Sequence, residues 1–232
     1  MPPVTSRLPP TPLLIGAGAA LFVAITILVS AAMTDAFDQW VTEAIRAPAL
    51  RDVLGPLGVV TELGSTLVVS VMAFVALAVG IALGSWRHGV AAALTILVAS
   101  LGNSALKLTM ARARPDLLEP IIVEHGFSFP SGHSALGMVA YGVLAVLASR
   151  SGMPLGARRA IIVGLGLVVA LIGISRVWLG VHYPTDVIAG WTAGGVVVLA
   201  YAALTRPASP GPVAAAVDEG RAGQRSDRSA AG

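Results

Sequence analysis

Long apolar segments, separated by short polar ones, constrain the fold of this chain more than any other feature. A helix needs about 20 mostly apolar residues to cross a bilayer, and a lipid-exposed chain must satisfy its own backbone hydrogen bonds. Six segments approach that length, at residues 13–33, 65–85, 89–106, 134–148, 160–174 and 187–204. The sequence therefore predicts an all-α integral membrane bundle of six transmembrane helices. A cleaved signal peptide is the alternative for 13–33, but the apolar core of such a peptide is shorter.

The composition agrees with a membrane domain and excludes several other classes. Hydrophobic residues make up 56% of the 232 residues and charged residues only 12%, about half the share usual in soluble domains. The absence of cysteine excludes disulfides, thiolate zinc sites and a thiol nucleophile. The net charge of +3 comes without a long basic run, so nucleic acid is not an expected partner. The expected partners are the bilayer and a membrane lipid.

One segment after the first apolar run has helical periodicity instead of uniform apolarity. Within residues 34–47 the apolar positions recur at spacings of three and four, at Phe37, Trp40, Val41, Ala44 and Ile45. This pattern predicts a short amphipathic helix that ends before Pro48. We expect it to pack on the mouth of the bundle, with Trp40 at headgroup level. A platform that guides a lipid substrate is an alternative.

The two ends of the chain differ from its middle. Residues 1–11 are rich in Pro, and residues 206–232 are rich in Pro, Ala, Ser and charge. We expect a disordered leader at 1–11, a membrane domain at 12–205 and a disordered cytoplasmic tail at 206–232.

Positive charges predict the orientation of the bundle. If the N-terminus is cytoplasmic, nine of the 15 Lys and Arg residues fall on the cytoplasmic side and six on the other. Cytoplasmic loops are enriched in Lys and Arg, so both termini are expected in the cytoplasm. Lys107 is the only lysine, a bias typical of GC-rich bacterial genomes, so we expect a bacterial inner membrane. The segments after the third and fifth apolar runs then face the extracytoplasmic side.

Three polar clusters lie at helix ends on that predicted outer side. The first runs from Lys107 to Arg114-Pro115, the second is Pro130-Ser131-Gly132-His133, and the third contains Ser175-Arg176, His182 and Asp186. A charge inside an apolar helix costs roughly 2.5–3.5 kcal/mol, so these groups must face each other, water or a ligand. Three of them, Lys107, Arg114 and Arg176, are cations at one membrane level. A phosphate dianion suits such a cluster.

The other residues of the clusters complete a site for phosphoryl chemistry. Ser131 and Gly132 precede a helix whose free N–H groups favour an anion. His182 is a candidate nucleophile, because imidazole can attack near neutral pH. Asp186, four residues later, can hold one ring N–H of His182 and leave the other nitrogen free. His133 is a candidate acid for the leaving alkoxide.

Together the clusters resemble the type 2 phosphatidic acid phosphatase family, the membrane branch of the acid phosphatase and vanadium haloperoxidase superfamily. The family's motifs are Lys, six residues, Arg-Pro; Pro-Ser-Gly-His; and Ser-Arg, five residues, His, three residues, Asp. All are present here between Lys107 and Asp186. The resemblance implies that His182 carries the phosphoryl group, Asp186 orients it and His133 is the general acid. It implies that five residues bind the phosphate, and that no metal or other cofactor is used. These five are Lys107, Arg114, Ser131, Gly132 and Arg176.

Other functions and substrates remain open at this point. A haloperoxidase shares the motifs, but those relatives are soluble. A transporter or flippase of a phosphorylated lipid is an alternative of another class; the polar residues gather at one membrane face, which disfavours a midplane pocket. We expect undecaprenyl diphosphate as the substrate, with phosphatidic acid and phosphatidylglycerophosphate as alternatives. This preference rests on family analogy.

A few polar residues and glycines lie outside the motif pattern. We interpret Arg112 as an interfacial anchor and His125 as solvated, and Glu62 either pairs with a cation of the site or faces the headgroups. Gly190 and Gly194 form a small face that favours close packing inside the bundle.

Overall fold

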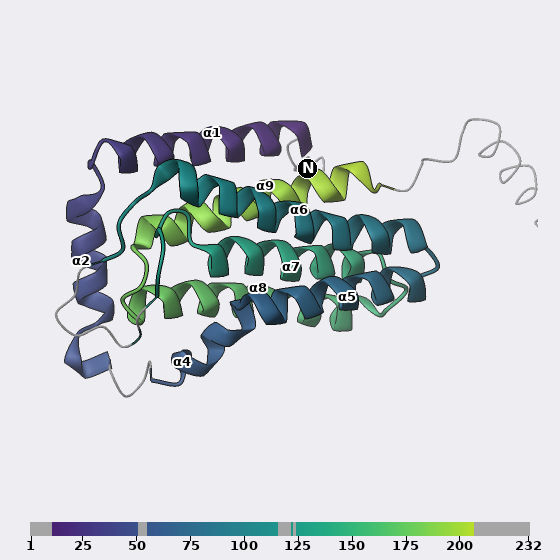
Figure 1. Ribbon diagram of the computed structural model, residues 1–232. Helices are drawn as coiled ribbons and strands as arrows, with labels where there is room; N and C mark the ends of the chain where they lie inside the picture. Colours follow the sequence, from purple (N-terminus) through teal and green to yellow (C-terminus); the bar gives the residue numbers. More distant parts are fainter. Residues whose placement is uncertain (1–10, 51–54, 116–121, 123, 207–232) are drawn as a thin grey trace, which may run out of the picture.

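The computed structural model describes residues 11–50, 55–115, 122 and 124–206 as a bundle of helices (Figure 1). Within these residues every regular element is helical, which confirms the predicted all-α class. The longer helices are α1 Thr11–Ser30, α2 Asp35–Ile45, α5 Thr66–Ala82, α6 Trp86–Met110, α7 Gly132–Ser149, α8 Leu155–Trp178 and α9 Pro184–Leu204. Short elements are η1 Pro48–Leu50, α4 Leu57–Val60 and η2 Thr61–Gly64. The predicted leader and tail lie outside the described residues, apart from their inner ends at Thr11 and Arg206.

Five of the described helices, α1, α6, α7, α8 and α9, are long and apolar enough to cross a membrane. A sixth span forms if Leu57–Gly64 and Thr66–Ala82 count as one, with a bend of 54° between them. The bend falls at Ser65, whose backbone is extended. Its Oγ caps α5 by accepting a hydrogen bond from the Val68 N–H at 3.4 Å. The chain is therefore a multi-pass membrane protein, as predicted.

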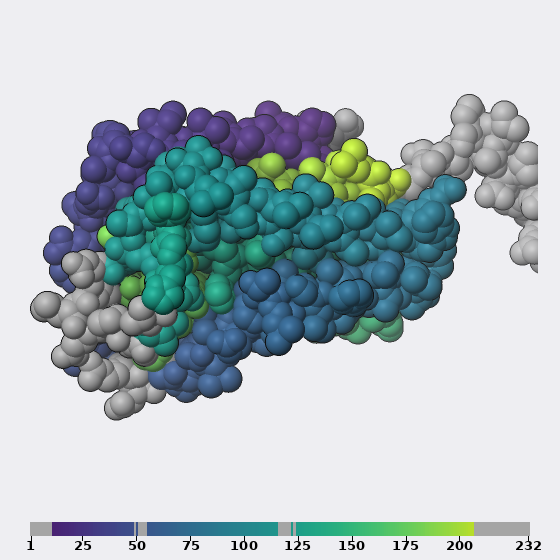
Figure 2. All heavy atoms as spheres, in the orientation of Figure 1, coloured from purple at the N-terminus to yellow at the C-terminus, as the bar shows by residue number. Residues whose placement is uncertain are grey.

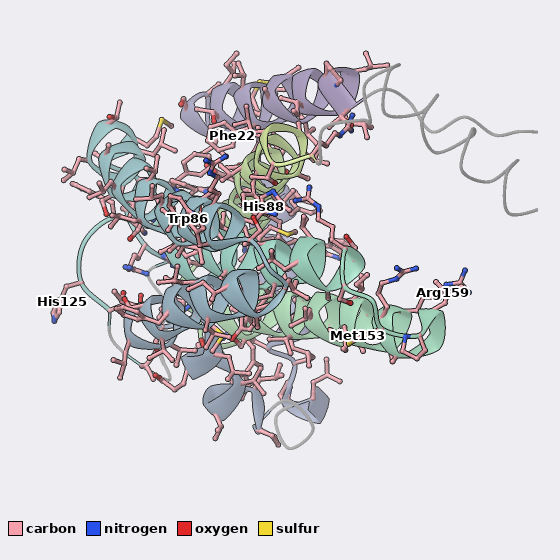
Figure 3. The ribbon with its side chains drawn as sticks, turned by 90° about the vertical axis from the view of Figure 1, so that its right-hand side faces the viewer. Phe22, Trp86, His88, His125, Met153 and Arg159 are labelled. Atoms are coloured by element: carbon pink, nitrogen blue, oxygen red, sulfur yellow. The ribbon has the colours of Figure 1, made fainter. Side chains whose placement is uncertain are left out.

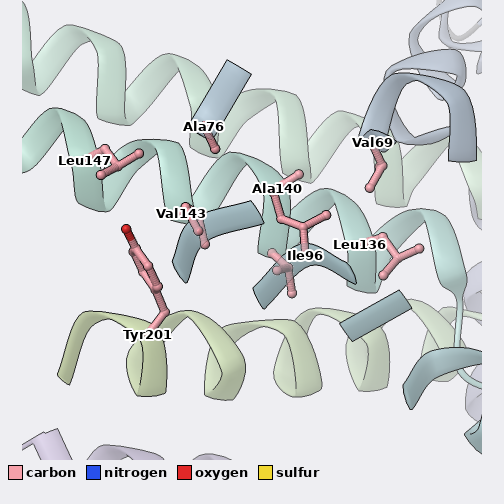
Figure 4. Close-up of a cluster of buried hydrophobic side chains, with 10 residues drawn as sticks. Val69, Ala76, Ile96, Leu136, Ala140, Val143, Leu147 and Tyr201 are labelled. Atoms are coloured by element: carbon pink, nitrogen blue, oxygen red, sulfur yellow. The ribbon is translucent and has the colours of Figure 1, made fainter. Parts of the chain in front are cut away.

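Helix α7 lies at the centre of the bundle and contacts α5, α6, α8 and α9. Its buried face is made of small and medium side chains, among them Val139, Ala140 and Val143 (Figure 4). Small side chains let neighbouring helices approach, and close packing is the main source of helix association in lipid. Gly190 and Gly194 confirm the prediction of packing within the bundle. A Cβ at Gly190 would lie 2.8 Å from the Ser131 carbonyl oxygen, and one at Gly194 would lie 2.7 Å from that of Ala135.

The outer surface of the bundle is apolar, the reverse of a soluble protein. Leu21, Val23 and Ile27 of α1 are exposed, as are Leu67 and Phe74 of α5. Helices α5 and α6 form much of the face seen in the space-filling view, with α1 along one edge (Figure 2). Such a surface is stable in contact with lipid chains, where each helix already satisfies its backbone hydrogen bonds.

Helix α1 packs on α9, and an aromatic pair also joins it to the segment before α7. Phe22, labelled in Figure 3, stacks on Phe129 with ring centroids 6.3 Å apart. Phe129 is fully buried and immediately precedes the Pro130-Ser131-Gly132-His133 segment. The segment before α7 is therefore packed against α1.

Helix α2 runs across the ends of the long helices (Figure 1). It contacts α8 and α9, which agrees with the prediction that it packs on the mouth of the bundle. Ile45, one of the apolar positions, packs against the buried cluster that contains Leu57 and Trp178, but the fully buried positions of α2 are polar. Phe37 and Trp40 are 45% and 67% exposed, whereas Asp38 and Thr42 are buried. The reason is that Asp38 has polar partners in the bundle, which an apolar face could not supply.

Candidate active site

All three predicted clusters meet at one end of the bundle, the end crossed by α2 (Figure 1). This follows from the alternating direction of the helices. The C-terminal ends of α6 and α8 and the N-terminal ends of α7 and α9 lie there, and they carry Lys107, Arg176, His133 and Asp186 respectively. These four residues thus sit at the ends of packed helices, which hold them more firmly than a loop would, whereas Arg114 and His182 lie in the connecting segments.

The centre of the site is the pair His182 and Asp186, both completely buried. His182 Nδ1 lies 3.3 Å from Asp186 Oδ2, and the same carboxylate oxygen accepts the Tyr183 N–H at 2.9 Å. On the other side of the ring, Arg114 Nη1 lies 3.3 Å from Nε2 and donates to the Val181 carbonyl at 2.8 Å. With the ring proton on Nδ1, the lone pair of Nε2 points toward a cation. Nε2 can therefore attack an anion that Arg114 binds.

The environment keeps the His182 ring neutral. Burial lowers its pKa to about 4, and the charges of Lys107 and Arg176 act in the same direction. Asp186 opposes this effect without cancelling it. At neutral pH the imidazole therefore has a free lone pair, which a nucleophile requires.

Two guanidinium groups meet at a carboxylate that sequence reasoning left without a role. Glu124 Oε2 lies 3.0 Å from Arg114 Nη2, and Glu124 Oε1 is hydrogen-bonded to Arg176 Nη2. Burial would raise the pKa of Glu124, but the charges of Arg176 and Arg114 outweigh it and hold the pKa below its usual value. Glu124 is therefore ionised between two cations.

Arg176 is 1% exposed and is fixed by polar groups from other elements. Its Nη1 donates to Thr61 Oγ1 of η2 at 2.8 Å. Its Nε has no hydrogen-bond partner among the described residues. The bent segment before α5 thus orients one face of the guanidinium and leaves a donor available for a further acceptor.

Lys107 and Gly132 bring α6 and α7 together at the site. Lys107 Nζ donates to the carbonyls of Phe127 at 2.7 Å and Ser128 at 3.4 Å. A Cβ at Gly132 would lie 3.7 Å from Lys107 Cε and 3.2 Å from Asn103 Nδ2. Glycine therefore leaves room for this approach at the start of α7.

Ser131 and His133 flank that start. Ser131 is fully buried, and its Oγ caps α7 by accepting from the Ser134 hydroxyl at 3.0 Å and the Ser134 N–H at 3.5 Å. The Ser131 N–H donates to the Asp186 carbonyl at 3.0 Å, which links α7 to α9. His133 lies against Gly64, where a Cβ would stand 3.1 Å from His133 Cβ.

Arg112 is not the interfacial anchor that we predicted. Its side chain is 13% exposed and lies behind Asp186, with Nη1 donating to Asp186 Oδ1 at 2.7 Å and Nη2 donating to Asp38 Oδ2 at 2.8 Å. Sequence reasoning missed Asp38 and Thr61 altogether. The one signal for Asp38 was an acidic residue between apolar positions of the predicted amphipathic helix.

His125 and Glu62 stay at the edge of the site. The His125 side chain is exposed and extends away from the helices, as Figure 3 shows, while its carbonyl accepts a bond from Arg114 Nη2 at 3.3 Å. This agrees with a solvated histidine. The Glu62 side chain is exposed, which favours the headgroup-facing alternative.

Comparison with known proteins agrees with this geometry. The model of the PAP2 superfamily matches residues 88–209. The chain is also 33% identical over 186 residues to phosphatidylglycerophosphatase B of Bacillus subtilis (strain 168), covering 75% of this chain and 88% of that protein. The chain belongs to the PAP2 superfamily. The family match begins in α6 and includes all three motif clusters.

Two further relatives match over shorter stretches. The chain is 35% identical to an undecaprenyl-diphosphatase of Sulfolobus acidocaldarius over 47% of this chain and 50% of that protein. It is 33% identical to a lipid A 1-phosphatase of Rhizobium etli over 44% of this chain and 43% of that protein.

The fold also matches a solved PAP2 structure. A transmembrane PAP2-type phosphatidylglycerolphosphate phosphatase from Bacillus subtilis aligns with a TM-score of 0.68 and 27% identity, over 82% of this chain and 94% of that one. The resemblance extends beyond the family match and includes most of the bundle. The chain is a membrane phosphatase of the class that hydrolyses lipid phosphates.

Proposed function

We propose that this PAP2 enzyme hydrolyses the terminal phosphate of a membrane lipid through a phosphohistidine at His182. The observation that carries the proposal is the position of His182 Nε2, 3.3 Å from Arg114 Nη1, while Nδ1 lies 3.3 Å from Asp186. A neutral imidazole oriented by a carboxylate and facing a cation has the requirements of a nucleophile toward phosphorus.

The reaction we propose has two steps. In the first, Nε2 of His182 bonds to phosphorus while the bond from phosphorus to the leaving oxygen breaks, and His133 gives that oxygen a proton. In the second, water attacks the phosphohistidine with His133 as the base, and inorganic phosphate leaves. Lys107, Arg114 and Arg176, with the Ser131 and Gly132 segment, stabilise the charge on the phosphoryl oxygens. The scheme assigns no step to a metal.

Two lipid substrates fit the proposal. Undecaprenyl diphosphate is the first candidate, and one matched relative bears that activity in its name. Phosphatidylglycerophosphate is the second, favoured by the relative that matches over 88% of its length. Both present a terminal phosphate at the headgroup level, and the cationic cluster binds the group that they share.

The test is phosphate release by the protein purified in detergent. Undecaprenyl diphosphate, phosphatidylglycerophosphate and phosphatidic acid are compared, with His182→Ala beside the wild type. Release by the wild type alone supports the proposal, and the ranking of kcat/KM identifies the preferred lipid. Vesicle uptake of a phosphorylated lipid without phosphate release would favour a transporter instead.

We also propose that the site faces the extracytoplasmic side of a bacterial inner membrane. The chain has no cysteine, so single substitutions are clean probes. His125→Cys marks the site end and Arg159→Cys, in the first turns of α8, marks the opposite end; both positions are exposed and labelled in Figure 3. In intact spheroplasts a membrane-impermeant maleimide should label only the first. Labelling of only the second would reverse the orientation.

A further inference from the structure

Behind the catalytic pair lies a second polar cluster that the reaction scheme does not use. The two oxygens of Asp186 face different ways. Oδ2 accepts from the Tyr183 N–H and lies against His182, whereas Oδ1 accepts from Arg112 Nη1 at 2.7 Å. Asp186 is therefore held from behind by a group that lies outside the family's motif pattern.

Arg112 connects Asp186 to a second carboxylate. Its Nη2 donates to Asp38 Oδ2 at 2.8 Å, and Nη1 also lies 3.0 Å from Thr185 Oγ1. The guanidinium carbon lies 4.0 Å from the centre of the Tyr183 ring, so the plane of the group is covered as well. Burial would lower the pKa of Arg112, but Asp186 and Asp38 outweigh it and raise the pKa. Arg112 is thus a permanent cation between two carboxylates.

Asp38 belongs to α2, which runs across the ends of the long helices, yet it is fully buried. It accepts four hydrogen bonds: from Arg112, from the Thr185 N–H at 2.9 Å, from the Thr185 hydroxyl at 2.7 Å and from the Thr34 hydroxyl at 3.2 Å. A buried carboxylate is costly unless it is paired and hydrogen-bonded. The partners of Asp38 meet that condition, and two of those bonds come from the residue next to Asp186.

We propose that Asp38 and Arg112 are positioning residues that hold Asp186, and through it the His182 ring, in the geometry for attack. The carboxylate of α2, the guanidinium of Arg112 and the carboxylate of α9 form one chain of charge-assisted hydrogen bonds. Helix α2 is on this account part of the catalytic unit. The inference rests on the proposed function, since it takes His182 as the nucleophile.

The test is a double-mutant cycle between Asp38→Asn and Asp186→Asn. Asparagine has the shape of aspartate but can accept at only one oxygen and bears no charge. We expect Asp38→Asn to lower kcat about 10- to 100-fold with little change in KM, because a small misplacement of a catalytic group has effects of that size. If Asp38 acts through Asp186, the double variant is no slower than Asp186→Asn alone. A structural role independent of Asp186 would multiply the two losses.

Controls separate this inference from other failures. Glu43→Gln removes an exposed charge from the same helix and should leave kcat unchanged. Thr185→Val removes the hydroxyl that donates to Asp38 while keeping the shape of the side chain. It replaces Asp38→Asn in the cycle if a thermal unfolding measurement shows that Asp38→Asn is not folded. The decrease in kcat caused by Thr185→Val should likewise disappear when Asp186→Asn is already present.

The possible outcomes are distinguishable. If wild type releases phosphate, His182→Ala does not, and Asp38→Asn and Thr185→Val keep wild-type kcat, the positioning role is wrong and the proposed function stands. Multiplied losses in the cycle also overturn the positioning role. If His182→Ala is active, the proposed function itself fails.

Discussion

Both sides of the pair His182 and Asp186 consist of basic and acidic side chains, but the two sides differ in net charge. On the front, three cations, Lys107, Arg114 and Arg176, face one carboxylate, Glu124. At the rear, one cation, Arg112, lies between two buried carboxylates, Asp38 and Asp186. Among the described residues the front therefore has an excess of two positive charges, and the rear, where the exposed Asp35 also lies 3.9 Å from Arg112, has an excess of two negative charges.

This difference indicates what each side does. An excess of two positive charges matches a phosphate dianion, and the Nε of Arg176 has no hydrogen-bond partner within the described part of the chain. At the rear, Arg112 and Asp38 already have protein partners, so the rear has the character of a support. Arg112 and Arg114 are two residues apart yet contact opposite sides of the pair, and both follow Ala111, which ends α6 with φ of 46°.

Among the substitutions that test this comparison, loss of the nucleophile should decrease kcat the most. His182→Ala removes the atom to which phosphorus bonds and is expected to lower kcat at least about 10³-fold, since the front alone can bind phosphate without transferring it. Phosphate release from the lipid measures kcat, and labelling with a radioactive substrate measures the phosphoenzyme, with an alkaline quench because acid hydrolyses phosphohistidine. Labelled protein in the variant would place the nucleophile elsewhere.

Loss of the general acid should have a somewhat smaller effect that depends on the leaving group. His133→Ala is expected to slow a lipid ester about 10²–10⁴-fold, because an alkoxide needs a proton to leave. An aryl phosphate, whose leaving group is a weaker base, should be slowed much less. Equal losses on both substrates would contradict the acid role and leave His133 as a part of the anion site.

The pH profile tests the environment of His182. The attacking ring must be neutral, and its pKa is lowered to about 4, so kcat/KM should hold down to near pH 5 and fall about tenfold per unit below pH 4, after correction for substrate ionisation. The unfolded chain takes up this proton at its ordinary pKa of about 6.5, so stability is lost as pH falls from about 6.5 through 4. An acid limb near pH 6.5 would show that the folded ring is solvated.

Most of the fold and the front of the site could be predicted from the sequence, for physical reasons. A bilayer demands long apolar helices, so six spans could be predicted; five are single helices with shifted ends, as where α6 runs to Met110 instead of 106, and the sixth needs the bent segment before α5. Charges are costly in such helices, so Lys107 and Arg176 stood out against their surroundings. The expected roles of these residues stay proposals.

The rear could not be predicted, because its partners are distant in sequence and ordinary in type. Asp38 and Asp186 are separated by 148 positions (186 minus 38), and acidic residues in a surface helix usually face solvent. The periodicity of α2 located the helix but did not indicate that Asp38 is buried, which follows from its hydrogen bonds to Thr185 and Arg112. A hydrophobic pattern carries no information on such pairing.

The smallest expected effect concerns Glu124, the carboxylate that the described residues place on the front. Glu124 joins Arg114 and Arg176, and an incoming phosphate competes with it for the same donors. Glu124→Gln removes a negative charge near the phosphate position, so inorganic phosphate should inhibit about three- to tenfold more tightly, since like charges repel at this range. Glu62→Gln, an exposed residue at the same end, is the matched control and should change the inhibition constant little.

The competitive inhibition constant of inorganic phosphate measures this effect. Tighter inhibition would mean that the front is held below its full affinity for phosphate by its own carboxylate, which would favour release of product. Weaker inhibition would instead show that Glu124 organises the two guanidiniums, as Asp38 is proposed to organise Arg112. The front would then need a carboxylate support of its own, and the contrast between an open front and a supported rear would not hold.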